Sequence, residues 1–146
     1  MRIFIGSDHA GFEAKERIIA YLKTLSHEVT DCGAYEFNLD DDYPDFIKPV
    51  AVAIMNDKDA RGIIIGKSGQ GEAMCANRFK GVRAAVWYGG GHEPLHLSRE
   101  HNDANVLSIG AGIVPETEML TGVEVWINTK FPGEERHLRR IAKLDI

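Results

Sequence analysis

The sequence predicts an α/β protein, a Rossmann-like three-layer α/β/α sandwich with a five-stranded parallel sheet. Two observations lead to this fold class. Five short apolar runs, each bounded by glycine or a polar turn, have the composition of strands: RIFIG, EVTD, GIIIG, RAAVWY and NVLSIG. Segments with one apolar face alternate with these runs, at residues 11–25, 44–56 and 115–128. This alternation predicts βαβ units, which place helices on both faces of a parallel sheet.

The elements can be assigned in chain order. RIFIG is followed by a helix over residues 11–25, which gathers five apolar side chains on one face: Phe12, Ile18, Ile19, Leu22 and Leu25. EVTD and the helix at 44–56 come next, followed by GIIIG, whose glycine-rich exit leads into another helix. A helix that ends near His101 precedes NVLSIG, and the helix at 115–128 follows it. A last helix, over about residues 132–143, follows TKFPGEE. In a doubly wound sheet the ligand crevice lies at the carboxyl ends of the strands, so we expect every motif below at that edge.

Composition limits the possible functions. At 146 residues, a single domain over residues 1–146 is expected. A hydrophobic fraction of 44% and a net charge of -5 describe a soluble globular protein without the basic excess of a nucleic-acid binder. MRIFIGSDH turns polar after five residues and no stretch approaches the ~20 apolar residues of a membrane span, so a cytoplasmic location is expected. Cys32 and Cys75 lack a Cys-x-x-Cys spacing and are expected to be reduced and buried.

Two familiar motifs fail on spacing. Gly66-Lys67-Ser68 would be a phosphate-binding P-loop only if a glycine stood five positions before Gly66, where the chain has Arg61. The glycine run at 89–92, GGGH, is similar to an esterase oxyanion hole, but Gln70 stands where a nucleophile elbow around Ser68 needs glycine. A nucleotide-binding module and a serine hydrolase are therefore disfavoured.

The segment GSDHAGF, residues 6–12, ends the first strand and opens the first helix. Asp8 can be explained as a helix cap. Capping does not explain the adjacent His9 or the following Gly11, so a functional role for Asp8 and His9 is favoured. The acidic loop EFNLDDDYPD is more simply interpreted as a solvated surface.

A glycine-rich loop follows the third strand, with Ser68, Gly69, Gln70 and Gly71 before Glu72. Glycines let backbone N–H groups point into a small space, and a helix N-terminus favours an anion there. Glu72 alone could simply stabilise the helix end. Beside a hydroxyl and the glycine N–H groups, its carboxylate becomes a candidate general base next to an oxyanion hole.

Two further groups could serve a site. His101 and Asn102 close a helix before the fifth strand, where a histidine can also act as a partner of the helix dipole. Arg136 and Arg140, four residues apart on the last helix, share one face and could bind a phosphate or form a solvated basic surface.

Six segments in order resemble the B-type ribose-5-phosphate isomerase family, which also holds galactose-6-phosphate and allose-6-phosphate isomerases: GSDHAGF, DYPD, GKSGQGE, ANRFKGVRAA, SREHNDANVLSIG and RHLRR. The similarity runs from Ile3 to about Ile141. It implies an aldose-ketose isomerase that acts through a cis-enediol, with no cofactor or metal. It also implies a homodimer or dimer of dimers whose active sites lie at the subunit interface, the C-terminal helix reaching the partner.

The resemblance also implies residue roles. One branch of the family takes its base from a cysteine that ends the third strand, where this chain has Gly66, and the other from a glutamate that Glu72 matches. Ring opening would fall to Asp8 and His101, and enediolate stabilisation to Ser68 and the loop amides. Contacts to phosphate or sugar are implied for the remaining positions: His9, Tyr43, Gly69, Gln70, Gly71, Asn102, Arg136 and Arg140.

Two departures from the family pattern bear on the substrate. Gly112 stands where the family often has a phosphate-binding arginine, and the loop WYGGGHEPLHL is glycine-richer than usual. Ribose 5-phosphate is the expected substrate. The alternatives are a tetrose 4-phosphate, allose 6-phosphate or galactose 6-phosphate, or a non-catalytic sugar-phosphate-binding protein.

Overall fold

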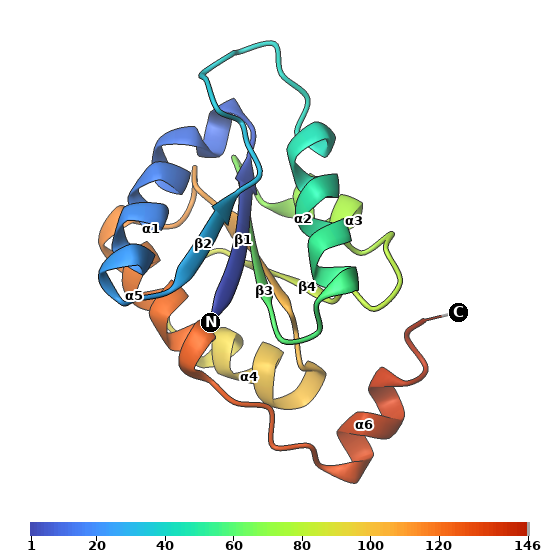
Figure 1. Ribbon diagram of the computed structural model, residues 1–146. Coiled ribbons are helices and arrows are strands. Elements are labelled where there is room, and N and C mark those ends of the chain that lie inside the picture. The colour runs from blue at the N-terminus through green and yellow to red at the C-terminus, as the bar shows by residue number, and fades with distance from the viewer. Residues whose placement is uncertain (146) are drawn as a thin grey trace.

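The computed structural model describes residues 1–145 and contains the predicted five-stranded sheet between two layers of helices (Figure 1). The strands are β1 (Arg2–Ser7), β2 (Glu28–Asp31), β3 (Arg61–Gly66), β4 (Ala84–Trp87) and β5 (Val106–Gly110). Their order across the sheet is β2-β1-β3-β5-β4, and every neighbouring pair is parallel. The α/β prediction is therefore confirmed, including the number and direction of the strands.

The helices form the outer layers. They are the short 3₁₀ helix η1 (His9–Gly11), α1 (Phe12–Thr24), α2 (Pro44–Asn56), α3 (Gln70–Ala76), α4 (Glu93–Asn102), α5 (Glu116–Asn128) and α6 (Glu135–Ile141). One face of the sheet is covered by α2 and α3, and the other by α1, α4 and α5 (Figure 1). Helix α6 is shorter than the predicted range of 132–143. None of the helices formed within residues 1–145 is long and apolar enough to cross a membrane.

Strand β3 divides the hydrophobic core into two clusters. Its isoleucines point alternately to the two faces, as the period of a strand requires. Ile63 and Ile65 join the cluster beneath α1, α4 and α5, whereas Ile64 joins the cluster beneath α2 and α3. All three side chains are fully buried, so the continuous isoleucine run is explained by burial on both faces.

The two cysteines differ from expectation in one respect. Cys32 and Cys75 are free, as predicted, but each is half-buried rather than fully buried. Burial, aided by the nearby charge of Asp31, raises the pKa of the Cys32 thiol to about 11. A thiol held protonated in this way is a poor nucleophile, which agrees with a packing role.

The position of α5 on the sheet depends on Gly122. An ideal Cβ built at Gly122 would lie only 2.1 Å from Cη2 of Trp87, whose side chain is buried. The glycine therefore lets the helix backbone approach the indole ring directly.

We expect Gly122→Ala to destabilise the protein by ~1–3 kcal/mol, because the new methyl group would force the buried indole out of its place. At an unconstrained helix position the same change would stabilise by up to ~1 kcal/mol. Urea unfolding of both proteins measures the difference in free energy. In a Trp87→Leu background the penalty should largely disappear, and a more stable Gly122→Ala protein would contradict this packing.

Candidate functional site

The carboxyl ends of three central strands bring the first group of predicted residues together. In the sheet register Ser7 of β1 is paired with Ile65, and Gly66 of β3 is paired with Gly110 of β5. The segments that follow these strands must therefore begin side by side. One carries Asp8 and His9, and another carries the glycine-rich loop with Glu72.

Asp8 is a helix cap, as the simpler interpretation predicted. Its Oδ1 accepts hydrogen bonds from the backbone N–H groups of Ala10 at 3.0 Å and Gly11 at 3.3 Å. Burial is the main influence on this carboxyl and raises its pKa, although the two N–H donors oppose the rise. Asp8 has an effect beyond capping, because its negative charge also raises the pKa of Glu72.

Glu72 is buried in the first turn of α3, with 5% of its surface exposed. Its carboxylate occupies the space that a side chain at Gly66 would fill, since an ideal Cβ at Gly66 would lie 1.8 Å from Oε1. Burial raises the pKa of Glu72 above the ordinary value, and the charge of Asp8 adds to the rise. A carboxylate with a raised pKa at a strand edge is a better proton acceptor at neutral pH than a free glutamate.

The loop before Glu72 is fixed from two sides. Gly69 has a left-handed backbone with φ of 74°, and its carbonyl accepts a hydrogen bond from Oγ of Ser108 in β5 at 2.6 Å. Tyr43 covers the loop at Gly71, where an ideal Cβ would lie 2.9 Å from Cζ of the tyrosine ring. Within the loop, Oγ of Ser68 accepts from the N–H of Gln70 at 3.3 Å. The structure therefore places Tyr43 against the loop 68–71 that leads into Glu72.

His9 lies beside the acidic loop. Oδ1 of Asp41 accepts from the backbone N–H of His9 at 3.2 Å and lies 2.6 Å from Nδ1 of its ring. This hydrogen bond is the largest influence on His9 and raises the pKa of its imidazole. The acidic loop was expected to be solvated, but the side chain of Asp41 is only 6% exposed, so that interpretation is wrong at Asp41.

Ligand atoms of Asp8, His9 and Asp41 lie within 4.8 Å of one another and form a group that could hold a metal ion. The 2.6 Å distance between Nδ1 of His9 and Oδ1 of Asp41 is that of a direct charge-assisted hydrogen bond. Because the ring nitrogen and the carboxylate bind each other, the geometry favours a hydrogen-bonded pair of His9 and Asp41 over a metal site.

The remaining predicted residues lie at the opposite edge of the sheet. Helix α4 ends at Asn102, just before β5 begins, and a segment that enters a strand lies at the amino edge of a parallel sheet. Our expectation that every motif lies at the carboxyl edge is therefore wrong for His101 and Asn102. Figure 1 shows α4 and α6 together at the bottom of the molecule, far from the loop between β2 and α2 at the top.

At this second position the rings of His101 and His137 stack, with their centroids 4.5 Å apart and their planes at 12°. His137 is the buried residue of α6, and burial together with the charge of Arg136 lowers the pKa of its imidazole. Arg136 and Arg140 project from the same helix, and Nε of Arg136 donates to Glu134 at 2.8 Å. The stacking partner of His101 was not foreseen, although RHLRR was noted in the sequence.

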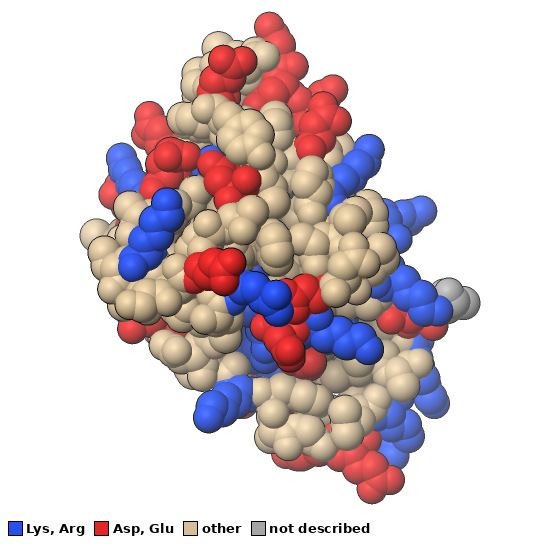
Figure 2. Space-filling model, viewed as in Figure 1, with Lys and Arg blue, Asp and Glu red and all other residues tan. Residues whose placement is uncertain are grey.

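Figure 2 shows one acidic concentration on this face. Acidic side chains gather at the top over the loop between β2 and α2, whereas basic and acidic side chains lie together over α6 at the lower right. We call Asp8, His9, Tyr43, the loop 68–71 and Glu72 the carboxyl-edge group. The amino-edge group consists of His101, Asn102, Arg136 and Arg140. Within residues 1–145 the two groups lie at opposite edges of the sheet.

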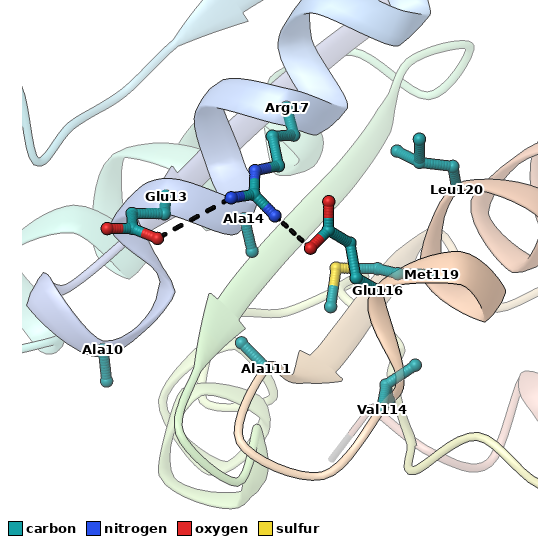
Figure 3. Close-up of a pocket in the computed structure, with 9 residues that line it drawn as sticks. All are labelled: Ala10, Glu13, Ala14, Arg17, Ala111, Val114, Glu116, Met119 and Leu120. Atoms are coloured by element: carbon teal, nitrogen blue, oxygen red, sulfur yellow. Dashed lines mark ion pairs between the residues drawn. The ribbon is translucent and has the colours of Figure 1, made fainter.

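A cavity of about 190 Å³ lies between α1 and α5 (Figure 3). It contains a guanidinium, Arg17, but Glu13 and Glu116 flank this group and offset its charge. Apolar side chains complete the lining, including Val114, Met119 and Leu120. No predicted site residue lines this cavity, and its paired charge makes it unsuited to a phosphate.

Comparison with known proteins identifies the family of this chain. The family model for ribose/galactose isomerases matches residues 3–144. Over 141 residues, the chain is 42% identical to ribose-5-phosphate isomerase B of Mycolicibacterium paratuberculosis, covering 97% of this chain and 87% of that protein.

Solved structures agree over the whole fold. The crystal structure of ribose-5-phosphate isomerase B from Mycoplasma genitalium with bound ribulose 5-phosphate matches with a TM-score of 0.93 at 39% identity, covering 98% of this chain and 93% of that chain. Ribose-5-phosphate isomerase B of Clostridium thermocellum gives a TM-score of 0.92 at 41% identity, with coverage of 99% and 95%. These full-length similarities confirm the resemblance recognised in the sequence, and the chain belongs to the ribose/galactose isomerase family.

Proposed function

We propose that this protein interconverts ribose 5-phosphate and ribulose 5-phosphate through a cis-enediol, with Glu72 as the base. The names of its relatives and the ribulose 5-phosphate bound in the Mycoplasma genitalium structure support the substrate. The observation that carries the chemistry is the buried Glu72 carboxylate beside the glycine-rich loop, in the space left by Gly66.

The reaction moves one proton between neighbouring carbons. Glu72 takes the proton from C2 of the open-chain aldose and returns it to C1, while a second proton passes between O1 and O2 with the help of Ser68. The negative charge that develops on oxygen is stabilised by N–H groups of the loop 68–71. A free glutamate with a pKa of about 4.3 is a weak base for this step, so burial that raises the pKa of Glu72 favours proton abstraction.

The substrate must also be opened and held. In this proposal Asp8 and His101 act on the sugar ring, and Tyr43 and Asn102 contact the sugar. His9, Arg136 and Arg140 bind the phosphate, for which guanidinium groups supply bidentate donors.

These residues can converge only if a second copy of the chain completes the site. The carboxyl-edge group supplies the base and oxyanion donors, but the amino-edge group lies at the other end of the same sheet. We therefore propose a homodimer in which the amino-edge group of one protomer faces the carboxyl-edge group of its partner. Helix α6 suits this role, since His137 is its buried residue and Leu138 is 50% exposed.

Gly112 supports a second candidate function, the isomerisation of a sugar phosphate other than ribose 5-phosphate. A Cβ at this position would lie 3.0 Å from the backbone carbonyl oxygen of Lys67, a tight contact that an arginine could occupy only after a small shift. A phosphate site without that arginine suits other sugar phosphates as well. Activity should therefore be compared on ribose 5-phosphate, a tetrose 4-phosphate, allose 6-phosphate and galactose 6-phosphate.

Glu72→Gln should reduce kcat about 10²–10⁴-fold, because the amide cannot accept the C2 proton. Proton NMR in D₂O follows both conversion of ribose 5-phosphate and exchange of its C2 proton. Phosphate affinity should stay near that of the unaltered protein, and Glu36→Gln, which changes an exposed carboxylate, is the matched control. Full turnover by Glu72→Gln would exclude the assigned base, and binding without exchange by the unaltered protein would indicate a non-catalytic binder.

Gly66→Ala should lower kcat about 10²-fold, since its methyl group would displace the Glu72 carboxylate by an ångström or more. Some thermal stability should be lost as well. Adding Glu72→Ala should recover that stability without recovering activity, because the collision is with the carboxylate itself. Differential scanning fluorimetry and the D₂O assay test both statements, and unchanged kcat in Gly66→Ala would refute the placement of the base.

Mixing two inactive variants, Glu72→Gln and His101→Asn, should restore activity if sites are shared between protomers. Random pairing by refolding of the mixture gives one intact site in each mixed dimer, so about a quarter of full activity is expected for a two-fold symmetric assembly. Mixed dimers are identified with two affinity tags. Inactive mixed dimers would show that the two groups do not meet across the interface.

A further inference from the structure

We propose that Asp41 is a positioning residue that fixes the His9 imidazole in its charged, Nε2-donating form for the phosphate of the substrate. This inference rests on the proposed function, because it concerns how the same site holds its anion. Asp41 itself has no role in the mechanism described above.

Asp41 differs from the neighbouring aspartates in its burial and its contacts. Three consecutive aspartates, Asp40, Asp41 and Asp42, occupy the loop, yet only the middle one is turned inward, with 6% of its side chain exposed. Its Oδ1 meets two N–H groups of His9, one from the backbone at 3.2 Å and one from the ring at 2.6 Å. The carboxylate therefore holds both the chain and the ring of His9 at the carboxyl edge.

This arrangement selects the protonation of the ring. A carboxylate can only accept, so Nδ1 must carry the proton that it shares with Asp41. Nε2 is then free, and it can donate to a phosphate oxygen only when the ring is an imidazolium. Phe37, whose ring lies edge-on at 6.4 Å, packs against the imidazole and helps to keep its orientation.

The surrounding charges favour the imidazolium. The hydrogen bond to Asp41 is the main cause that raises the pKa of His9; burial opposes it, and the negative charges of Asp8 and Asp40 add to the rise. Oδ2 of Asp41 is buried and makes no hydrogen bond within residues 1–145. An acceptor without a partner is costly to bury, so the adjacent positive ring is the group that compensates the charge of Asp41.

NMR titration of the histidines provides a direct test. The protein has six histidines, and a His9→Asn variant assigns the His9 resonance. Asp41→Asn should lower the pKa of His9 relative to the unaltered protein, because the amide retains an acceptor but loses the charge. Asp42→Asn makes the same charge change at the exposed neighbouring position and should leave the His9 pKa close to its original value.

Ligand binding gives the second measurement. At neutral pH, Asp41→Asn should weaken binding of inorganic phosphate and raise KM for ribose 5-phosphate about tenfold, with a smaller change in kcat, since a charge-assisted bond becomes a neutral one. Lowering the pH should restore much of the affinity by protonating the ring. In a His9→Asn background, Asp41→Asn should add little, because the two residues act as one unit.

Three results would overturn the inference: an unchanged His9 pKa in Asp41→Asn, additive losses from Asp41→Asn and His9→Asn, or inorganic phosphate that leaves the His9 resonance unmoved. Each is read by NMR or binding and needs no turnover. An unaltered protein that isomerises no sugar phosphate, yet shows the Asp41-dependent His9 pKa and phosphate binding, would refute the proposed function alone.

Discussion

The candidate site depends on the absence of a side chain at the end of β3. The Glu72 carboxylate lies where a Cβ at Gly66 would be, so strand end and helix start approach each other without any intervening atom. Ser108 fixes the intervening loop to β5, and the fully buried isoleucines of β3 fix the strand to both helix layers. Burial in this space restricts the positions open to the Glu72 carboxylate, and such restriction favours proton transfer to a carbon.

The same constraint bears on the two branches that the family resemblance implies. The resemblance gives one branch a cysteine base at the position of Gly66, and the other a glutamate base at the position of Glu72. In this structure a side chain at position 66 and the Glu72 carboxylate would compete for the same space. The proposed glutamate base is therefore compatible with this packing because position 66 is a glycine.

Much of the fold could be predicted because its signals are local. The isoleucine run of β3 and the apolar stripes of α1, α2 and α5 are read directly from neighbouring residues, and no bound of these elements differs from the prediction by more than one residue. The edge at which His101 lies depends instead on topology: it precedes a strand, whereas Asp8 and Glu72 follow strands. Asp41 could not be distinguished from Asp40 and Asp42, because three identical residues differ only in how the loop turns. His137, which stacks on His101, is separated from it in the sequence by β5 and α5, so a local sequence pattern could not predict this contact either.

The division of the core has a spectroscopic consequence. Both tryptophans of the chain, Trp87 and Trp126, pack in the cluster beneath α1, α4 and α5, where Nε1 of Trp87 donates to the carbonyl of Gly91 at 3.2 Å. The layer of α2 and α3, which carries Tyr43 at its edge and Glu72, contains no tryptophan. Intrinsic fluorescence therefore reports on one side of the sheet, and a rearrangement of the layer that bears Glu72 would change hydrogen exchange while leaving the emission spectrum almost unaltered.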